Sequence, residues 1–226
     1  MSISVIIPVL NEEKALPYCL KNLREQHKEF ELIVVDGGST DATLNIARED
    51  DGLTLLSSER GRANQMNAGA AHASGDWLVF LHADTRLPNR ALGDIEALSA
   101  KNDVQAGCFH QRFSGEHWLL RAISSLHNWR CHRSRIIYGD QCLFIRRSFF
   151  RQLQGFPNTD ILEDVMLSEK IVEHSTPVIL DTAVITDSRK FEQRGILRSF
   201  LEVFIIMSCY ELGLPVLARG FFSAVR

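Results

Sequence analysis

The chain has 226 residues, of which 45% are hydrophobic and 23% are charged, and its formal net charge at pH 7 is −3. This length suits one large α/β domain with a modest appendage, and the composition is that of a globular protein rather than a disordered one. The absence of an overall positive charge argues against nucleic acid as a partner. Locally, eight arginines lie between residues 110 and 151, which indicates either a solvated basic face or a surface that binds an anion.

The five cysteines are odd in number and widely spaced, and no pair has C-x-x-C spacing. A zinc site or a disulfide framework is therefore not expected, and a reducing cytoplasm is the simpler setting. The N-terminus lacks the basic and small-residue regions of a signal peptide. The most hydrophobic stretch, residues 196–217, is interrupted by Arg198, Glu202 and Glu211. Because a membrane span needs ~20 apolar residues, we expect a protein that does not cross a bilayer.

Strands and helices are expected to alternate over the first 85 residues. Apolar runs predict buried strands at residues 3–9, 31–35, 53–57 and 77–81. Apolar spacing between them predicts a helix that is capped by Asn11 and contains residues 16–23, a second helix after residue 40, and a third over residues 62–73. Such alternation predicts a parallel sheet covered on both faces, in which ligands bind at the carboxyl ends of the strands.

The pattern becomes less regular after residue 88. We expect a strand within residues 104–113, helices over 118–130 and 165–172, and strands near 142–145 and 177–187. No repeat or linker divides the chain, so residues 1–190 are interpreted as one domain and residues 191–226 as a helical extension. Basic residues near this boundary could meet a diphosphate, anionic lipid or only solvent: Arg189, Lys190 and Arg194.

The extension is predicted to be amphipathic. Arg194, Arg198 and Glu202 recur every four residues and form one polar stripe, while the remaining face is broadly apolar. That apolar face is expected to pack on the same domain, on a second copy of the chain in a homodimer, or peripherally on the inner face of the cytoplasmic membrane.

The turn after the first strand excludes two common nucleotide sites. Its sequence, PVLNE at residues 8–12, contains no G-x-G-x-x-G, and no G-x-x-x-x-G-K-[ST] occurs in the chain. A nucleoside diphosphate would therefore be held by other means than a glycine nest at the first strand.

Acidic residues stand at three predicted element boundaries. Asp36, followed by two glycines, is placed either to accept hydrogen bonds from a ribose or base or to cap the next helix. Asp84 ends the fourth strand, where a carboxylate can bring a hard divalent cation to phosphate oxygens, although loop aspartates are also ordinary. The adjacent Glu163 and Asp164 begin a helix, and their mutual repulsion indicates separate tasks unless both simply favour the helix N-terminus.

Four strings in this order resemble glycosyltransferase family 2, the large inverting GT-A group. They are ISVIIPVLNEE at 3–13, ELIVVDGGSTDAT at 31–43, NAGAAHASGDWLVFLHADT at 67–85, and GFP…ILEDVMLS at 155–168. The resemblance implies the GT-A α/β fold, with a mostly parallel central sheet flanked by helices and a C-terminal amphipathic helical segment. Two further strings, RGRANQMNAGAA and YGDQCLFIRR, resemble a bacterial subgroup associated with radical-SAM and selenoprotein-like domains.

The same resemblance implies a donor site. The nucleoside pocket would be formed by Pro8, Asn11, Glu12 and Asp36. Asp84 would be the metal-binding member of the D-x-D motif, with Mg²⁺ or Mn²⁺ as the cofactor. This chain departs from the motif at its first acid, which is His82 here. A neutral imidazole can still hydrogen-bond a ribose hydroxyl or bind a metal, so the motif is retained.

The resemblance further implies that Asp164 is the catalytic base, with Glu163 beside it, and that Asp36, Asp84 and Asp164 meet in one cleft. Residues near the nucleotide or sugar would be Arg62 and Asn67. Residues that approach the donor sugar or the acceptor would be Gly139, Asp140 and Gln141.

The implied activity is transfer of a sugar from a nucleoside-diphosphate sugar, by default a UDP-sugar, to an acceptor hydroxyl in a metal-assisted inverting displacement. The sequence does not identify the acceptor. One alternative is a sugar nucleotidyltransferase, for which residues 11–13 are a poor phosphate-binding loop. Another is a non-catalytic module that binds nucleotide sugars, an interpretation that His82 leaves open.

Overall fold

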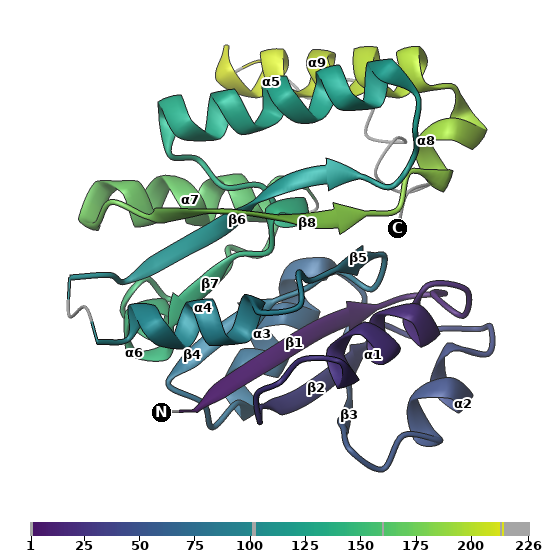
Figure 1. Ribbon diagram of the computed structural model, residues 1–226, viewed down its shortest axis with the longest axis vertical. Coiled ribbons are helices and arrows are strands. Elements are labelled where there is room, and N and C mark those ends of the chain that lie inside the picture. The colour runs from purple at the N-terminus through teal and green to yellow at the C-terminus, as the bar shows by residue number, and fades with distance from the viewer. Residues whose placement is uncertain (1, 101–102, 160, 213, 215–226) are drawn as a thin grey trace.

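An eight-stranded sheet in the order β3-β2-β1-β4-β7-β6-β8-β5 runs through the molecule (Figure 1). The structure is a computed structural model that describes residues 2–100, 103–159, 161–212 and 214. The strands are β1 (Ile3–Val9), β2 (Glu31–Asp36), β3 (Thr54–Ser57), β4 (Trp77–Phe80), β5 (Thr85–Arg86), β6 (Ala106–Phe113), β7 (Phe144–Arg146) and β8 (Val178–Thr186).

The predicted parallel half is confirmed, because β2 pairs in parallel with β1 and β3, and β1 pairs in parallel with β4. The second half mixes directions: β7 is antiparallel to both β4 and β6, and β6 is parallel to β8. Two reversals restore the original direction, so β6 and β8 point the same way as β1 and β4. The carboxyl ends of strands from both halves therefore face one side of the molecule.

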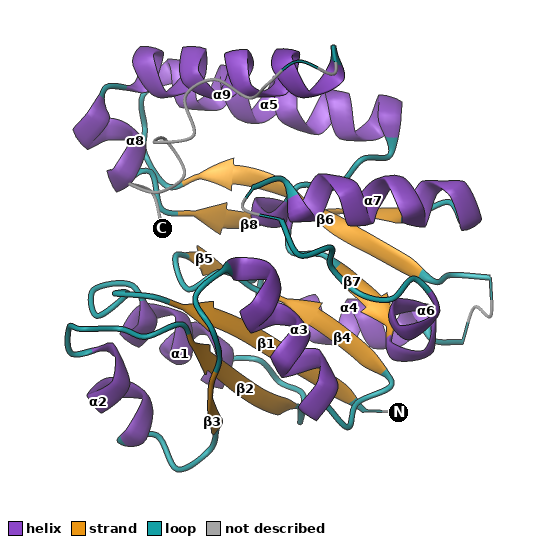
Figure 2. Ribbon diagram, turned by 180° about the vertical axis from the view of Figure 1, so that it is seen from behind, coloured by secondary structure: helices purple, strands orange, loops and turns teal. Residues whose placement is uncertain are grey.

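Helices cover both faces of this sheet (Figure 2). One core packs α1 (Leu16–Arg24), α2 (Thr43–Arg48) and α4 (Ala91–Leu98) against strand residues that include Val5, Ile7 and Val79. The other packs α3 (Arg62–His72), α6 (Arg147–Gln152) and α7 (Glu163–His174) against residues that include Ile6 and Leu78. Successive strand residues point to opposite faces, so a strand covered on both sides must be continuously apolar.

Two long helices lie side by side over the β6–β8 part of the sheet (Figures 1 and 2): α5 (Trp118–Ser134) and α9 (Ile196–Glu211). The short α8 (Arg189–Arg194) leads into α9 and spans the predicted boundary at residue 190. Ile206 of α9 packs against Leu162 and Val165 at the start of α7. No helix within the described part of the chain combines the length and apolar character that a bilayer span requires.

The predicted cap of the first helix is wrong. α1 begins at Leu16 with Ala15 at its N-cap, and Pro17 in the first turn needs no hydrogen-bond acceptor. Asn11 instead has a φ of 57°, a left-handed conformation that asparagine tolerates better than most residues. Its Oδ1 atom accepts a hydrogen bond of 2.8 Å from the Thr40 backbone N–H. Asn11 therefore joins the loop after β1 to the loop after β2.

Two helical glycines separate the effect of close packing from the effect of helix propensity. A Cβ atom at Gly69 in α3 would lie 2.5 Å from Ile6 Cγ2, whereas one at Gly93 in α4 would have nothing within 4 Å. Gly93→Ala should stabilise the protein by roughly 0.5–1 kcal/mol through helix propensity. Gly69→Ala should destabilise it, because overpacking typically costs ~1–3 kcal/mol. Urea unfolding of both variants measures the difference, and equal stabilisation would contradict close packing at Gly69.

Candidate active site

A cavity of about 490 Å³ opens at the carboxyl ends of the strands, a volume typical of ligand sites. It is bordered by the loops after β1 and β4, the loop before α3, the first turn of α7, and the helices α5, α8 and α9. The structure brings most of the predicted site residues to this cavity: Pro8, Glu12, Arg62, His82, Asp84, Gly139, Asp140, Glu163 and Asp164.

Four predicted residues do not line it: Asn11, Asp36, Asn67 and Gln141. The buried Asp36 carboxylate accepts hydrogen bonds from the Gly38 and Ser39 backbone N–H groups, at 2.9 and 3.1 Å for Oδ2. Gln141 is also buried, and its Oε1 atom accepts a hydrogen bond from the Tyr138 backbone N–H. Contact of these residues with a nucleotide stays a prediction.

Two amides of α3 fix the backbone around the cavity. The Gln65 side-chain Nε2 donates to the carbonyl oxygens of Val9 and Val35, at 2.7 and 2.8 Å, and so holds the ends of β1 and β2 together. The Asn67 amide donates to the Phe156 carbonyl and accepts from its N–H, at 2.8 and 3.0 Å. Asn67 thereby anchors the segment that leads to α7, a positioning role that its sequence context did not reveal.

Lys190 of α8 connects the carboxylates of Glu12 and Asp84. Its Nζ atom lies 2.9 Å from Glu12 Oε1 and 3.5 Å from Asp84 Oδ2. Burial raises the pKa of Glu12 despite the opposing charge of Lys190. Burial would lower the pKa of Lys190, but the charges of Asp84 and Glu12 outweigh it and raise that pKa. This position in the cavity therefore favours a positive charge.

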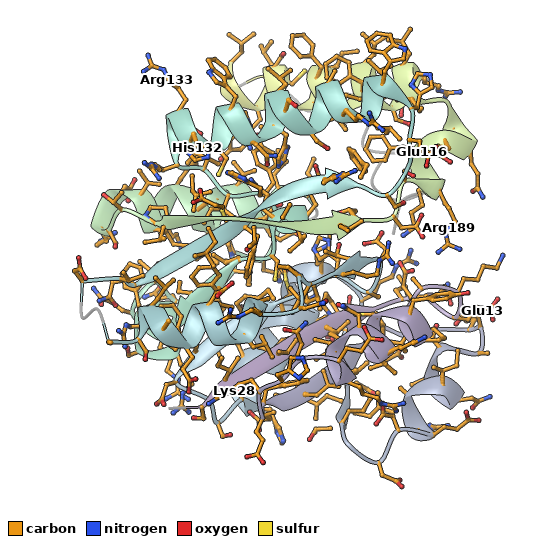
Figure 3. The ribbon with its side chains drawn as sticks, viewed as in Figure 1. Glu13, Lys28, Glu116, His132, Arg133 and Arg189 are labelled. Carbon is orange, nitrogen blue, oxygen red and sulfur yellow. The ribbon has the colours of Figure 1, made fainter. Side chains whose placement is uncertain are left out.

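The other two basic residues predicted near the boundary point elsewhere. Arg189 pairs with Asp187 at 2.6 Å on the outer surface (Figure 3), and Arg194 lies 3.9 Å from Glu202. Lys190 is thus the member of this cluster that the structure directs into the cavity.

His82, Gly139 and Asp164 converge at a second point. The Gly139 backbone N–H donates to Asp164 Oδ2 at 2.5 Å, and the Val165 N–H donates to Oδ1 at 2.9 Å. A Cβ atom at Gly139 would lie 2.8 Å from His82 Cε1 and 3.2 Å from Asp164 Oδ2. Both side chains therefore pack against this glycine, and a larger residue there would displace them.

The pKa values of the Asp164 carboxyl and the His82 imidazole are shifted in opposite directions from their ordinary values. Desolvation, together with the charge of Glu163, raises the pKa of Asp164 to about 6, although Arg62 and the backbone hydrogen bonds oppose this. Desolvation, together with the charge of Arg62, lowers the pKa of His82 to about 4. At neutral pH the site therefore holds a neutral imidazole beside a carboxylate that is more basic than a normal aspartate.

Further charged groups complete the polar part of the cavity. The buried Glu163 carboxylate lies 3.5 Å from Arg62 Nη1. Asp140 Oδ1 lies 3.4 Å from His127 Nε2. Burial would raise the pKa of Asp140, but His127, His82 and Arg130 together outweigh it and lower that pKa.

The sequence did not single out His127 or Arg130, although Arg130 belongs to the arginine-rich segment. The Arg130 guanidinium carbon lies 3.5 Å from the centre of the Tyr138 ring. Within the described residues, its Nη2 atom is buried without a hydrogen-bond partner. Arg146 and Arg147 of the same segment instead donate to backbone carbonyl oxygens. The arginine-rich segment therefore contributes Arg130 to the cavity lining, and Arg146 and Arg147 to hydrogen bonds that hold the backbone.

Solved structures with this arrangement are GT-A glycosyltransferases. The mannosyltransferase PcManGT from Pyrobaculum calidifontis, solved with GDP-Man and Mn²⁺, has a TM-score of 0.68 and 25% identity, over 81% of this chain and 56% of that one. Staphylococcus aureus TarS 1–349, solved with UDP-GlcNAc, has a TM-score of 0.70 and 22% identity, over 84% of this chain and 59% of that one. The fold is therefore GT-A, as predicted.

Residues 4–154 match the model of glycosyl transferase family 2, and the chain belongs to that family. A PGL/p-HBAD biosynthesis glycosyltransferase of Mycobacterium bovis is 44% identical over 91 residues, which are 37% of this chain and 36% of that protein. The chain thus covers about a third of that relative's length. Glu163 and Asp164 lie beyond the matched segment, so their roles rest on the geometry of the cavity.

The charge environment of His82 can be tested directly. Its imidazole should titrate with a pKa of about 4, as followed by the ring-proton chemical shift in NMR. Lys190→Gln should raise this pKa, because removing a neighbouring positive charge favours the protonated ring. A wild-type His82 pKa near the ordinary histidine value of ~6.5 would contradict the burial of its imidazole close to the charge of Arg62.

Proposed function

We propose that this chain transfers a sugar from a nucleoside-diphosphate sugar to an acceptor hydroxyl, with inversion, in one displacement. The observation that carries the proposal is the presence in one cavity of two carboxylates in different surroundings: Asp84 lies beside the ammonium group of Lys190, and Asp164 has a raised pKa. Family membership supports the reaction class. The Pyrobaculum mannosyltransferase, which was solved with GDP-Man and Mn²⁺, supports the donor class and a divalent metal.

Asp164 is the proposed base. Two backbone N–H groups orient its carboxylate, and a pKa of about 6 leaves it mostly ionised at neutral pH yet able to accept a proton readily. The acceptor oxygen forms a bond to the anomeric carbon as the bond to the diphosphate breaks, and its proton passes to Asp164. His82, with a pKa of about 4, is a weaker base and is proposed to hydrogen-bond the donor instead.

We propose that Glu12, Asp84 and Lys190 form the donor side of the cavity, and its carboxylates suit a divalent cation. No group of three or more metal-binding side chains forms within the described residues, but Mg²⁺ in transferase sites usually uses one or two carboxylates together with substrate phosphate oxygens. Asp84 is the proposed ligand, and the ammonium group of Lys190 already shows that this position attracts positive charge. A bound Mg²⁺ or Mn²⁺ would neutralise charge that develops on the leaving diphosphate. Lys190 is proposed to pair with the same diphosphate.

The nucleotide is proposed to be UDP by default, with GDP as the alternative suggested by the Pyrobaculum structure. Both can be tested with the divalent metal, because a ligand that binds only the native state raises its thermal stability. A rise in melting temperature with one nucleotide and not the other would identify the nucleobase of the donor as uracil or guanine.

Metal dependence should reside in Asp84. Asp84→Ala should abolish the metal-dependent part of nucleoside-diphosphate affinity, because a carboxylate is the ligand that Mg²⁺ and Mn²⁺ prefer. His82→Ala should weaken binding without removing metal dependence. Calorimetric titrations with UDP and GDP, with and without EDTA, measure both effects. An Asp84→Ala variant as metal-dependent as the wild type would refute this assignment.

Asp164→Asn should separate an enzyme from a binding module. Loss of a general base typically lowers the rate by ~10²–10⁴-fold, while donor affinity should change little. In the wild type, kcat/KM should fall as the pH drops through about 6, since a protonated Asp164 cannot accept the acceptor proton. The matched variant Glu163→Gln should lower the rate less, and its pH inflection should move to lower pH, because the charge of Glu163 helps to raise the pKa of Asp164. Near-normal turnover of Asp164→Asn would leave Glu163 or Asp140 as the next candidates.

A further inference from the structure

The cavity has two parts of opposite chemical character. Its floor carries the charged and polar groups described above, including His82 and Asp164. Its outer wall is apolar and is formed by two helices that are distant in sequence but adjacent in space (Figures 1 and 2). The wall residues are Ile123, Leu126 and Trp129 of α5 and Phe200, Phe204 and Met207 of α9. We call these six residues the apolar wall.

The apolar wall reaches the protein surface. Leu126, Trp129 and Phe204 line the cavity, yet their exposed fractions are 50%, 63% and 59%. Large apolar side chains that are this exposed and contiguous usually mark a binding surface. Asp164 and the apolar wall line the same cavity, so a molecule held at Asp164 can also contact α5 and α9.

From this continuity we propose that the acceptor is an amphiphile: its reacting hydroxyl lies at Asp164 and an apolar chain runs along the apolar wall. This inference rests on the proposed function, because it names the substrate class of the same site. A fully polar acceptor would leave the wall in water, whereas an apolar chain would cover it and gain the hydrophobic free energy of burial.

Geometry also favours this occupant over a second copy of the chain. The apolar wall is part of the cavity that contains the proposed base, so a partner subunit seated on it would stand between Asp164 and solvent. An amphiphilic acceptor can contact both the polar floor and the apolar wall. A protein partner that covered the wall would block access to the cavity.

The experiment uses primary n-alkanols from butanol to nonanol as minimal acceptors, below their solubility limits. Their dissociation constants are measured by ligand-observed NMR on the full chain, with saturating nucleoside diphosphate and Mg²⁺. Affinity should rise by up to about fourfold for each methylene group that is buried, until the chain passes the end of the wall. Trp129→Ser and Phe204→Ser should flatten this dependence on chain length.

Leu197→Ser is the matched control, because Leu197 is 60% exposed on α9 but does not line the cavity. All three replaced side chains are largely exposed, so the variants should fold, and circular dichroism checks this. Nucleoside-diphosphate binding, titrated separately, should be unchanged in every variant. If the wild type binds no nucleotide, the proposed function is wrong. If nucleotide binds but the affinity for alkanols does not depend on chain length, only the proposal of an amphiphilic acceptor is refuted.

Two other outcomes would also overturn the inference. A stable dimer that Phe204→Ser dissociates, with no chain-length dependence, would assign the wall to a second copy. Sedimentation of the chain with anionic phospholipid vesicles, again without chain-length dependence for soluble alkanols, would assign it to a membrane surface.

Discussion

Six carboxylates line one cavity, and the site has to accommodate their mutual repulsion: Glu12, Asp84, Asp140, Glu163, Asp164 and Asp187. Basic side chains from three helices lie beside five of them. Lys190 of α8 meets Glu12 and Asp84, Arg62 of α3 meets Glu163, and His127 of α5 meets Asp140. Asp164 has only partial compensation, because burial and Glu163 raise its pKa while Arg62 and two backbone N–H groups oppose them. The carboxylate that is least well compensated is the one best suited to accept a proton.

The strand directions in the sheet bring the charged residues of the cavity to one edge. β1 and β4 run in parallel at its centre, so the loops that carry Glu12 and Asp84 leave the same edge. The reversal at β7 returns β6 and β8 to that direction, and α8, which follows β8, carries Lys190 back across the opening. Asn67 fixes the segment before α7 through Phe156, which lies 89 residues further along the chain. The pair of Glu12 and Asp84 and the pair of Glu163 and Asp164 are thereby held by separate elements around one cavity.

The parts of this arrangement that follow from local sequence could be predicted. Continuous apolar runs identified β1, β2 and β4, and polar residues directly after β1 and β4 identified Glu12 and Asp84. Long-range pairing could not be predicted in the same way. The contact between Lys190 and Glu12 joins residues 178 positions apart, and a lysine in a basic cluster resembles a surface residue until its partner is known. The apolar wall was missed for the same reason, since α5 and α9 acquire a shared face only when folded. Asn11 shows the reverse error, because an asparagine before a helix resembled a cap but binds the Thr40 backbone.

We propose that Asp84 binds the metal and that Asp164 accepts the proton, and anomalous diffraction from crystals grown with Mn²⁺ and a nucleoside diphosphate distinguishes these two roles. One anomalous peak is expected at roughly 2.1 Å from an Asp84 carboxylate oxygen, with the diphosphate completing the coordination and Asp164 free of metal. Lys190 should no longer be the cation nearest to Asp84. A Mn²⁺ ion bound by Glu163 or Asp164 instead, with Asp84 still paired to Lys190, would contradict the assignment of donor and base sides.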